Sequence, residues 1–244
     1  MKTLHFNALY ILTASVLLSL ESPVFGDVAG EKDVTQLASA NKEGFVPLFN
    51  GTSLEGWEQH SGKAEYRAED GAIVGRTVSN TGNSFLCTKR QYGDFVFEFE
   101  FKVAQGMNSG VQFRSQFFVE DTSFELLGKT YKMKADRVFG YQYEIDPSAR
   151  AYTAGIYDEA RRGWIFDLKE NEAARKAFKG GEWNSARIEC KGDHLQTFIN
   201  GVKAADLKDS ATPSGIIALQ VHGIGNKPPG DEIRWKNLRI KELR

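Results

Sequence analysis

Alternation of apolar and polar residues with a period of two dominates the chain from Gly44 onward. In residues 95–103, Phe stands at every second position until Val103, and Glu98, Glu100 and Lys102 lie between. This period is typical of a strand with one buried and one solvent-facing side. Such runs predict strands over Ala72–Arg76, Ser84–Thr88, Asp94–Val103, Ser109–Gln116, Tyr141–Asp146, Trp183–Lys191, His194–Asn200, Gly215–Val221 and Glu232–Ile240.

A helical pattern occurs in one short segment, Glu172–Lys179, with Asn171 as its N-cap and Gly180 following its last turn. Many strands and a single short helix predict an all-β fold, a two-sheet jelly-roll sandwich that forms one domain. Repeats of fixed period are missing, which counts against a propeller. The segment Phe117–Val138 interrupts the alternation, and we expect a long loop there, at the rim of a binding face.

The first 26 residues have the pattern of a signal peptide, with a short basic start, an apolar run over residues 6–20, and small residues before a cleavage point after Gly26. Residues 27–43 are polar and predict a linker, so that 44–244 form the folded domain. We therefore expect an exported protein, periplasmic or extracellular. The apolar run is shorter than the ~20 residues of a membrane span, so the cleaved protein should not cross a membrane. An uncleaved or lipid-tethered start is the alternative.

The charge balance of 31 Lys and Arg against 32 Asp and Glu leaves a net charge of −1. Without a basic stripe, nucleic acids and other polyanions are not expected as partners. Two cysteines, Cys87 and Cys190, cannot form a disulfide framework for a chain of this length. Free buried thiols are favoured over a bridge between them, although their spacing alone leaves both open.

Three of the predicted strands place polar side chains on one side, opposite the apolar side chains of the same strands. If these strands are neighbours, the resulting face offers the paired donors and acceptors that recognition of sugar hydroxyls requires. An ordinary wet side of an antiparallel sheet is the alternative. The side chains are Gln112 and Arg114, then Gln142, Glu144 and Asp146, and finally Gln220 and His222.

A second cluster of acids, arginines and aromatic residues lies in Gly155–Trp164. It predicts either a loop that lines the site or a salt-bridged turn at the surface. In the first case Tyr157, Arg161 and Trp164 would contact the substrate, with an aromatic ring stacked on a pyranose.

Six blocks of sequence follow one another in a recognisable order between residues 44 and 243. They are Phe45–Trp57, Asn108–Arg114, Gly140–Asp146, Glu182–Asn184, Gly215–Gly223 and Trp235–Ile240. Together they resemble the 3-keto-disaccharide hydrolase domain family, long catalogued as a domain of unknown function. The resemblance implies a concanavalin A-like jelly roll, exported from bacteria, that acts on glycosides oxidised to a ketone at carbon 3.

Such a substrate invites β-elimination, because a ketone at C3 acidifies the hydrogen on C2 and the aglycone can then leave C1. Glu144 or His222 would be the base, and Arg114 or a metal would polarise the ketone. Asp146 would orient His222 or complete a metal site. A divalent metal (Mn, Ca or Zn) on Glu144, Asp146 and His222 is a further candidate, although no metal-binding signature motif occurs.

Two other functions remain open. A non-catalytic, lectin-like carbohydrate-binding module would use the same sheet and aromatic residues. A retaining β-glucanase is suggested by Glu144-Ile145-Asp146, but that reaction needs two carboxyl groups about 5–5.5 Å apart. Residues 147–150 supply no further acid, which disfavours it.

Overall fold

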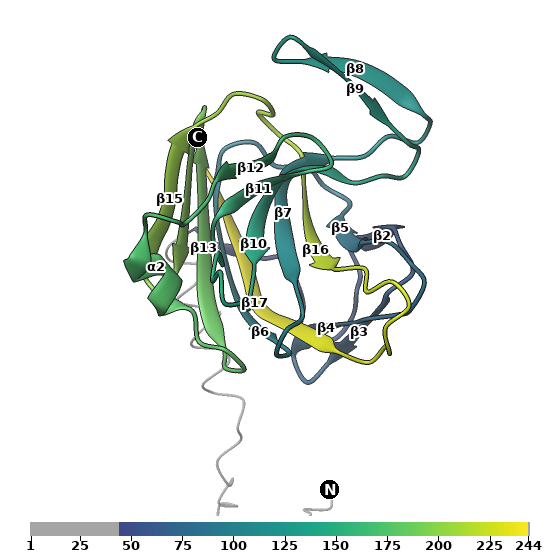
Figure 1. Cartoon of the computed structure of the whole chain (residues 1–244), viewed down its shortest axis with the longest axis vertical. Coiled ribbons are helices and arrows are strands. Elements are labelled where there is room, and N and C mark those ends of the chain that lie inside the picture. The colour runs from purple at the N-terminus through teal and green to yellow at the C-terminus, as the bar shows by residue number, and fades with distance from the viewer. Residues whose placement is uncertain (1–43, 244) are drawn as a thin grey trace, which may run out of the picture. The chain divides into compact units, whose positions relative to one another are not determined.

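The computed structural model describes residues 44–243, which form two large antiparallel sheets and a separate two-stranded hairpin (Figure 1). The predicted signal peptide (1–26) and linker (27–43) lie outside the described residues. The hairpin projects beyond the sheets in Figure 1. It consists of β8 (Thr122–Leu126) and β9 (Lys129–Met133).

The first large sheet, sheet A, has the strand order β15-β14-β13-β6-β17-β4-β3, and β1 pairs with β17. Consecutive strands pair in β3-β4 and in β13-β14-β15, whereas β6, β17, β4 and β1 are brought together by crossovers. Its strands are β1 (Val46–Pro47), β3 (Glu65–Glu69), β4 (Ala72–Arg76), β6 (Phe95–Val103), β13 (Asn184–Lys191), β14 (His194–Ile199), β15 (Val202–Lys208) and β17 (Glu232–Glu242).

The second large sheet, sheet B, has the order β12-β11-β10-β7-β16-β5-β2. Every pairing in it is antiparallel. Its strands are β2 (Trp57–Ser61), β5 (Ser84–Thr88), β7 (Ser109–Gln116), β10 (Phe139–Ile145), β11 (Ile156–Glu159), β12 (Gly163–Phe166) and β16 (Ile216–Val221).

Aromatic side chains from both sheets fill the space between them. Phe99 of β6 meets Tyr143 of β10 edge-on, with ring centroids 5.5 Å apart, and Phe113 stacks on Tyr141 at the same centroid distance. All four belong to one buried cluster that spans the two sheets. Burial of one side of each sheet is what the period-two pattern predicts, and the two-sheet sandwich is confirmed.

The outer face of sheet A is an ordinary charged surface. Glu98 lies between Arg187 and Arg239, and its Oε2 is 2.7 Å from Arg239 Nη2. These side chains keep 22–38% of their surface exposed, and isolated pairs at such sites contribute about 0–1 kcal/mol each. These ion pairs form the solvent-exposed face that alternation alone predicts. The outer face of sheet B differs from it, as described below.

All nine predicted strands are present, with ends that differ by at most two residues. The predicted loop 117–138 instead contains the β8–β9 hairpin, and the cluster 155–164 forms β11 and β12. β8 and β9 do alternate, with Phe124, Leu126, Tyr131 and Met133 on one side, and this short pattern was missed. β11 and β12 have only four residues each. Both cysteines are buried and free, as favoured from the sequence.

The helix α2 spans Glu172–Ala177, two residues shorter than predicted. Its N-cap is confirmed, because the Asn171 side chain accepts a hydrogen bond from the Ala174 N–H at 3.1 Å. Phe178 is extended rather than helical, and its ring stacks on Phe101 at 6.3 Å. The helix therefore ends where the ring of Phe178 packs against sheet A, two residues before the predicted end.

The aromatic layer should dominate stability. Phe99→Ala removes a ring that is 2% exposed and should lower the free energy of unfolding by about 3–5 kcal/mol. The control Lys102→Ala, on the exposed side of the same strand, should change it by less than about 0.5 kcal/mol. Urea unfolding followed by fluorescence measures both, and equal effects would contradict the shared core.

Candidate functional site

Four of the predicted site residues lie together on the outer face of sheet B, the side turned away from sheet A. Gln112 comes from β7, Gln142 and Glu144 from β10, and Gln220 from β16, and their alternate neighbours enter the core between the sheets. Their exposed fractions are only 0–5%. This face is therefore not a wet surface like that of sheet A, and its polar groups need partners inside the protein.

Part of this face is covered by residues 134–138, which join β9 to β10 and which we call the crossover segment. Val138 packs with Phe85 and Ala218 on the outer face. The segment is attached to β2, since Asp136 is 2.6 Å from His60 Nδ1 and accepts from the Ser61 N–H at 2.7 Å. A segment expected to be loop thus forms a fixed cover.

Glu144 is the central acid of the site. Asn108 Nδ2 donates to its Oε1 and Gln142 Nε2 donates to its Oε2, each at 2.7 Å. Burial raises the pKa of the Glu144 carboxyl to about 7, against the opposing effect of these two hydrogen bonds. A carboxyl group that exchanges its proton near neutral pH, with both oxygens oriented, has the properties of a general base.

Two aromatic residues, Tyr157 and Trp164, lie on the same face as this acid. Tyr157 of β11 pairs with Gln142 of β10 on one side and with Trp164 of β12 on the other. The two rings meet edge-on at 5.4 Å, and both side chains are half-buried. The pKa of the Tyr157 phenol is raised by partial burial and then by the charges of Glu159 and Glu144, so it lies near both acids.

Asp146 does not orient His222, contrary to expectation. Its carboxylate accepts from Arg150 Nε at 2.7 Å and from the Ser148 N–H at 3.2 Å, which ties down the loop after β10. Burial opposes its ionisation, but these partners outweigh that effect and hold the pKa of Asp146 below its usual value. The reason is local: a turn follows β10 directly and supplies its own donors.

His222 lies at the exposed end of β16, where its Nδ1 is 2.8 Å from the Gly223 carbonyl oxygen. Its charged neighbour is Glu159, which Arg137 Nη2 approaches to 3.1 Å and Asn83 Nδ2 to 3.4 Å. Burial raises the pKa of Glu159, while Arg137, His222 and Asn83 act against it.

Glu159, Arg137 and Asn83 were therefore missed as site residues. Glu159 stood inside the cluster 155–164, but only alternation of β11 would have separated it from Asp158, which faces the core. The positions of Arg137 and Asn83 depend on the crossover segment and the chain before β5, for which the sequence carries no signal.

Gln220 is completely buried, yet neither its Nε2 nor its Oε1 has a hydrogen-bond partner among residues 44–243. It pairs through its backbone with Gly110, which in turn pairs with Glu144. Gln220 and Glu144 thus lie in one row across the sheet, with the strand of Gly110 between them. Their backbones are about 10 Å apart. An unpaired buried amide is costly, and this one stands in the same row of the sheet as Glu144.

Arg114 was expected on this face, and that expectation is wrong. It has a φ of 46° at a bulge where the register between β7 and β16 shifts. Its guanidinium donates to the carbonyl oxygens of Gly93 and Gly192 and to Asp94 at 2.7–2.8 Å. The bulge breaks the period of two, so Arg114 links loops of sheet A instead of facing the site.

Arg161 was expected to contact substrate, and the structure places it elsewhere too. It pairs with the buried Asp158 at 2.7 Å, donates to Thr212 and lies over the rings of Phe139 and Tyr141. Its side chain is 1% exposed. The salt-bridged turn was therefore the correct interpretation for this arginine, while Tyr157 and Trp164 do line the face.

The predicted metal ligands Glu144, Asp146 and His222 are not assembled. Within residues 44–243, no three His, Cys, Asp or Glu side chains are placed to hold one ion. The Asp146 carboxylate is turned to Arg150, and both Glu144 oxygens already accept from amides. These residues do not fit the proposed metal, and we derive no step through one.

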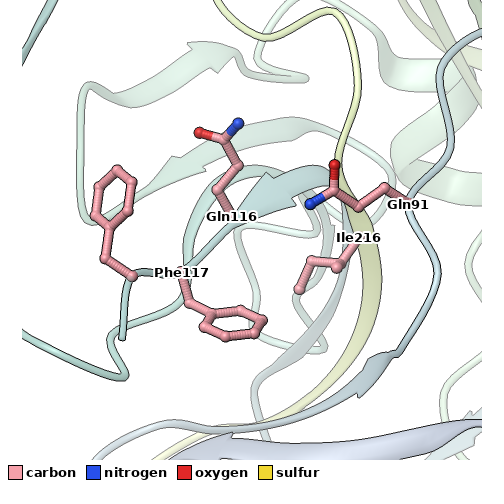
Figure 2. Close-up of a pocket in the computed structure, with 5 residues that line it drawn as sticks. Gln91, Gln116, Phe117 and Ile216 are labelled. Carbon is pink, nitrogen blue, oxygen red and sulfur yellow. The ribbon is translucent and has the colours of Figure 1, made fainter. Parts of the chain in front are cut away.

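A small pocket of about 200 Å³ lies at the other end of β7. Figure 2 shows Gln91, Gln116, Phe117 and Ile216 around it. Gln116 is six residues beyond Gly110, or about 20 Å along the strand. The pocket is therefore separate from the row formed by Glu144 and Gln220.

Residues 44–241 match the model of the 3-keto-alpha-glucoside-1,2-lyase-like domain. The chain belongs to this family. A 3-keto-disaccharide hydrolase of Bacteroides thetaiotaomicron is 24% identical over an alignment of 252 positions, which covers 88% of this chain and 83% of that relative. The resemblance seen in the sequence is confirmed, and the family is a carbohydrate-related one whose members fit a sugar as partner.

Solved structures agree on the fold. A galectin-like protein of Bacillus subtilis has a TM-score of 0.56 at 8% identity, covering 81% of this chain and 96% of its own. A glycosyl hydrolase candidate of Parabacteroides distasonis has a TM-score of 0.55 at 19% identity, and the match covers 84% of this chain and 97% of that one. The carbohydrate-binding module CBM66 of Bacillus subtilis has a TM-score of 0.52 at 18% identity, and the match covers 79% of this chain and 98% of that one. The jelly roll is confirmed for this family member. No helix in its described part is long and apolar enough to cross a membrane.

The raised pKa of Glu144 predicts a pH-dependent stability. Between the ordinary value of 4.5 and the folded value of about 7, unfolding releases a proton, so wild-type stability falls as pH rises through this window. Glu144→Gln has no proton to release at this position. Its free energy of unfolding relative to that of the wild type should therefore rise by about 3 kcal/mol between pH 4 and pH 8. Urea unfolding at both pH values measures the difference, and a constant difference would contradict the shift.

Proposed function

We propose that this protein cleaves the glycosidic bond of 3-keto-glycosides by removing the proton on C2 and eliminating the aglycone. The observation that carries the proposal is Glu144, a buried carboxyl with a pKa of about 7 between two oriented amides on a face lined by Tyr157 and Trp164. Family membership supplies the substrate class. A base of this strength matches a hydrogen acidified by an adjacent ketone.

The reaction balances with groups that the site contains. Glu144 takes the C2 proton, and the electrons of the C2–H bond form an enolate with the C3 ketone. Collapse of the enolate expels the C1 oxygen, which takes a proton and leaves as an alcohol. The product is a 1,2-unsaturated 3-keto sugar, and addition of water across its double bond gives net hydrolysis.

Other residues take the remaining roles. Gln220 has an unpartnered Nε2 across from Glu144 and can donate to the developing enolate oxygen, the task first expected of Arg114. His222, beside Glu159, is the candidate acid for the departing oxygen. Tyr157 and Trp164 offer an apolar platform for a sugar ring. Export to the periplasm or beyond remains our expectation from residues 1–26.

Substrate discrimination is the first test. The mature protein should release the chromophore from a nitrophenyl 3-keto-glucoside and leave the unoxidised glucoside intact, because only the ketone acidifies C2. Absorbance measures release, and mass spectrometry separates the unsaturated product from the hydrated one. Equal release from both glucosides would instead indicate ordinary glycoside hydrolysis.

Removal of the proposed base is the second test. Glu144→Gln keeps the shape of the side chain but cannot accept the proton, and should lower kcat about 100-fold or more; His222→Ala should also lower it strongly. Glu189→Gln, on the charged face of sheet A, is the matched control and should keep full activity. Near-wild-type turnover in both site variants would remove the assignment.

A carbohydrate-binding module is the second candidate, favoured by the structural likeness to CBM66. A lectin has no need for a base, so Glu144→Gln would then change sugar affinity only modestly. Calorimetric binding of the unoxidised disaccharide, with no release from any keto-glycoside, would make this the better description.

A further inference from the structure

Glu144 ends a continuous chain of buried hydrogen bonds across two strands. Ser115 Oγ donates to Gln112 Oε1 at 2.7 Å, Gln112 Nε2 to Gln142 Oε1 at 2.6 Å, and Gln142 Nε2 to Glu144 Oε2 at 2.7 Å. Ser115 and Gln112 are completely buried and Gln142 is 2% exposed. Water therefore cannot replace a lost partner, and each amide has to satisfy its neighbour.

The direction of this chain is set at its acid end. An ionised carboxylate only accepts, so Gln142 turns its Nε2 toward Glu144 and its Oε1 toward Gln112. Gln112 must then present its own Nε2, which leaves its Oε1 for the Ser115 hydroxyl. Ser115 thus closes the chain as its final donor.

The same groups also suit the opposite direction. A protonated Glu144 donates to Gln142, both amides turn over, and Gln112 Nε2 then meets Ser115 Oγ. The hydroxyl has a second acceptor for its proton, the Tyr141 carbonyl oxygen at 3.0 Å. Each of the three links therefore joins one donor to one acceptor in both arrangements.

Two glycines leave space for the side chains that form this hydrogen-bond chain. A Cβ at Gly110 would lie 2.5 Å from Gln142 Cδ, and one at Gly140 would lie 2.6 Å from Ser115 Oγ. Gly140 also has a φ of 131°, a conformation that other residues rarely adopt. The absence of a side chain at these two glycines thus provides the space for Gln142 and Ser115.

We propose that Ser115 and Gln112 are positioning residues for Glu144, which act through Gln142 by a hydrogen-bond chain that reverses when Glu144 takes a proton. The inference rests on the proposed function, in which Glu144 is the base. Ser115 and Gln112 make no hydrogen bond to the carboxylate and are completely buried, so their effect should reach the reaction along the hydrogen-bond chain.

The variants Gln142→Met, Gln112→Met and Ser115→Ala interrupt the chain at successive points. Gln142→Met should lower kcat most, and the other two by about tenfold, with KM within about twofold because no contact to the sugar is lost. The matched control is Ser109→Ala on the same strand, whose buried hydroxyl donates to the Gln220 main-chain oxygen at 2.6 Å and lies outside the chain. It should leave kcat within about twofold.

A second readout does not need activity. Side-chain amide signals of Gln112 and Gln142, assigned by their loss in the methionine variants, should be protected from solvent exchange in wild type and in Ser109→Ala. Glu144→Gln should shift the Gln112 amide signal although Gln142 lies between, and Ser115→Ala should broaden it. Thermal unfolding of each variant confirms that it is folded.

The outcomes separate the two proposals. A Ser115→Ala protein equal to Ser109→Ala in kcat and in both amide signals would overturn the chain, whether or not Glu144 is the base. Coupled amide signals in a protein that releases nothing from keto-glycosides would retain the chain and remove the proposed function.

Discussion

Aromatic side chains from β6, β7 and β10 pack against one another between the sheets, and this contact decides which side of sheet B is left for chemistry. With Phe113, Tyr141 and Tyr143 turned inward, their neighbours Gln112, Gln142 and Glu144 must face outward. These polar groups are nevertheless almost completely buried on the outside of a sheet, and the crossover segment covers another part of that face, over Phe85 and Ala218. Burial without water obliges them to bond to one another, and the ordered amide network follows from that requirement.

The surroundings of two carboxylates explain how neighbouring acids acquire different roles. Glu144 and Asp146 are two residues apart, and the pKa of the first is raised while that of the second is lowered. Glu144 has neutral amide partners, so the cost of burying its charge dominates. Asp146 has Arg150 and turn N–H groups, which stabilise its charge more than burial opposes it. The first is suited to exchange a proton and the second to hold a loop.

The two outer faces show why a jelly roll alone does not specify an activity. Sheet A carries a half-exposed ladder of arginines and glutamates, whereas sheet B carries buried amides, one of them unpartnered, and acids with raised pKa values. Similar folds are found in a galectin-like protein and in a carbohydrate-binding module. Function therefore has to be argued from the site rather than from the architecture.

Period-two alternation by itself determined the all-β class, the nine predicted strands and the side of its own strand on which each of Gln112, Gln142, Glu144 and Gln220 lies, because a strand with one buried side must repeat every two residues. The Asn171 cap was equally local. Tertiary structure alone decided the rest, including that these strands are neighbours. A bulge against β16 reversed Arg114, and the pairing of β11 together with the crossover segment brought Glu159 and Arg137 into contact. Such features depend on contacts between residues far apart in the chain, whose energies no local pattern records.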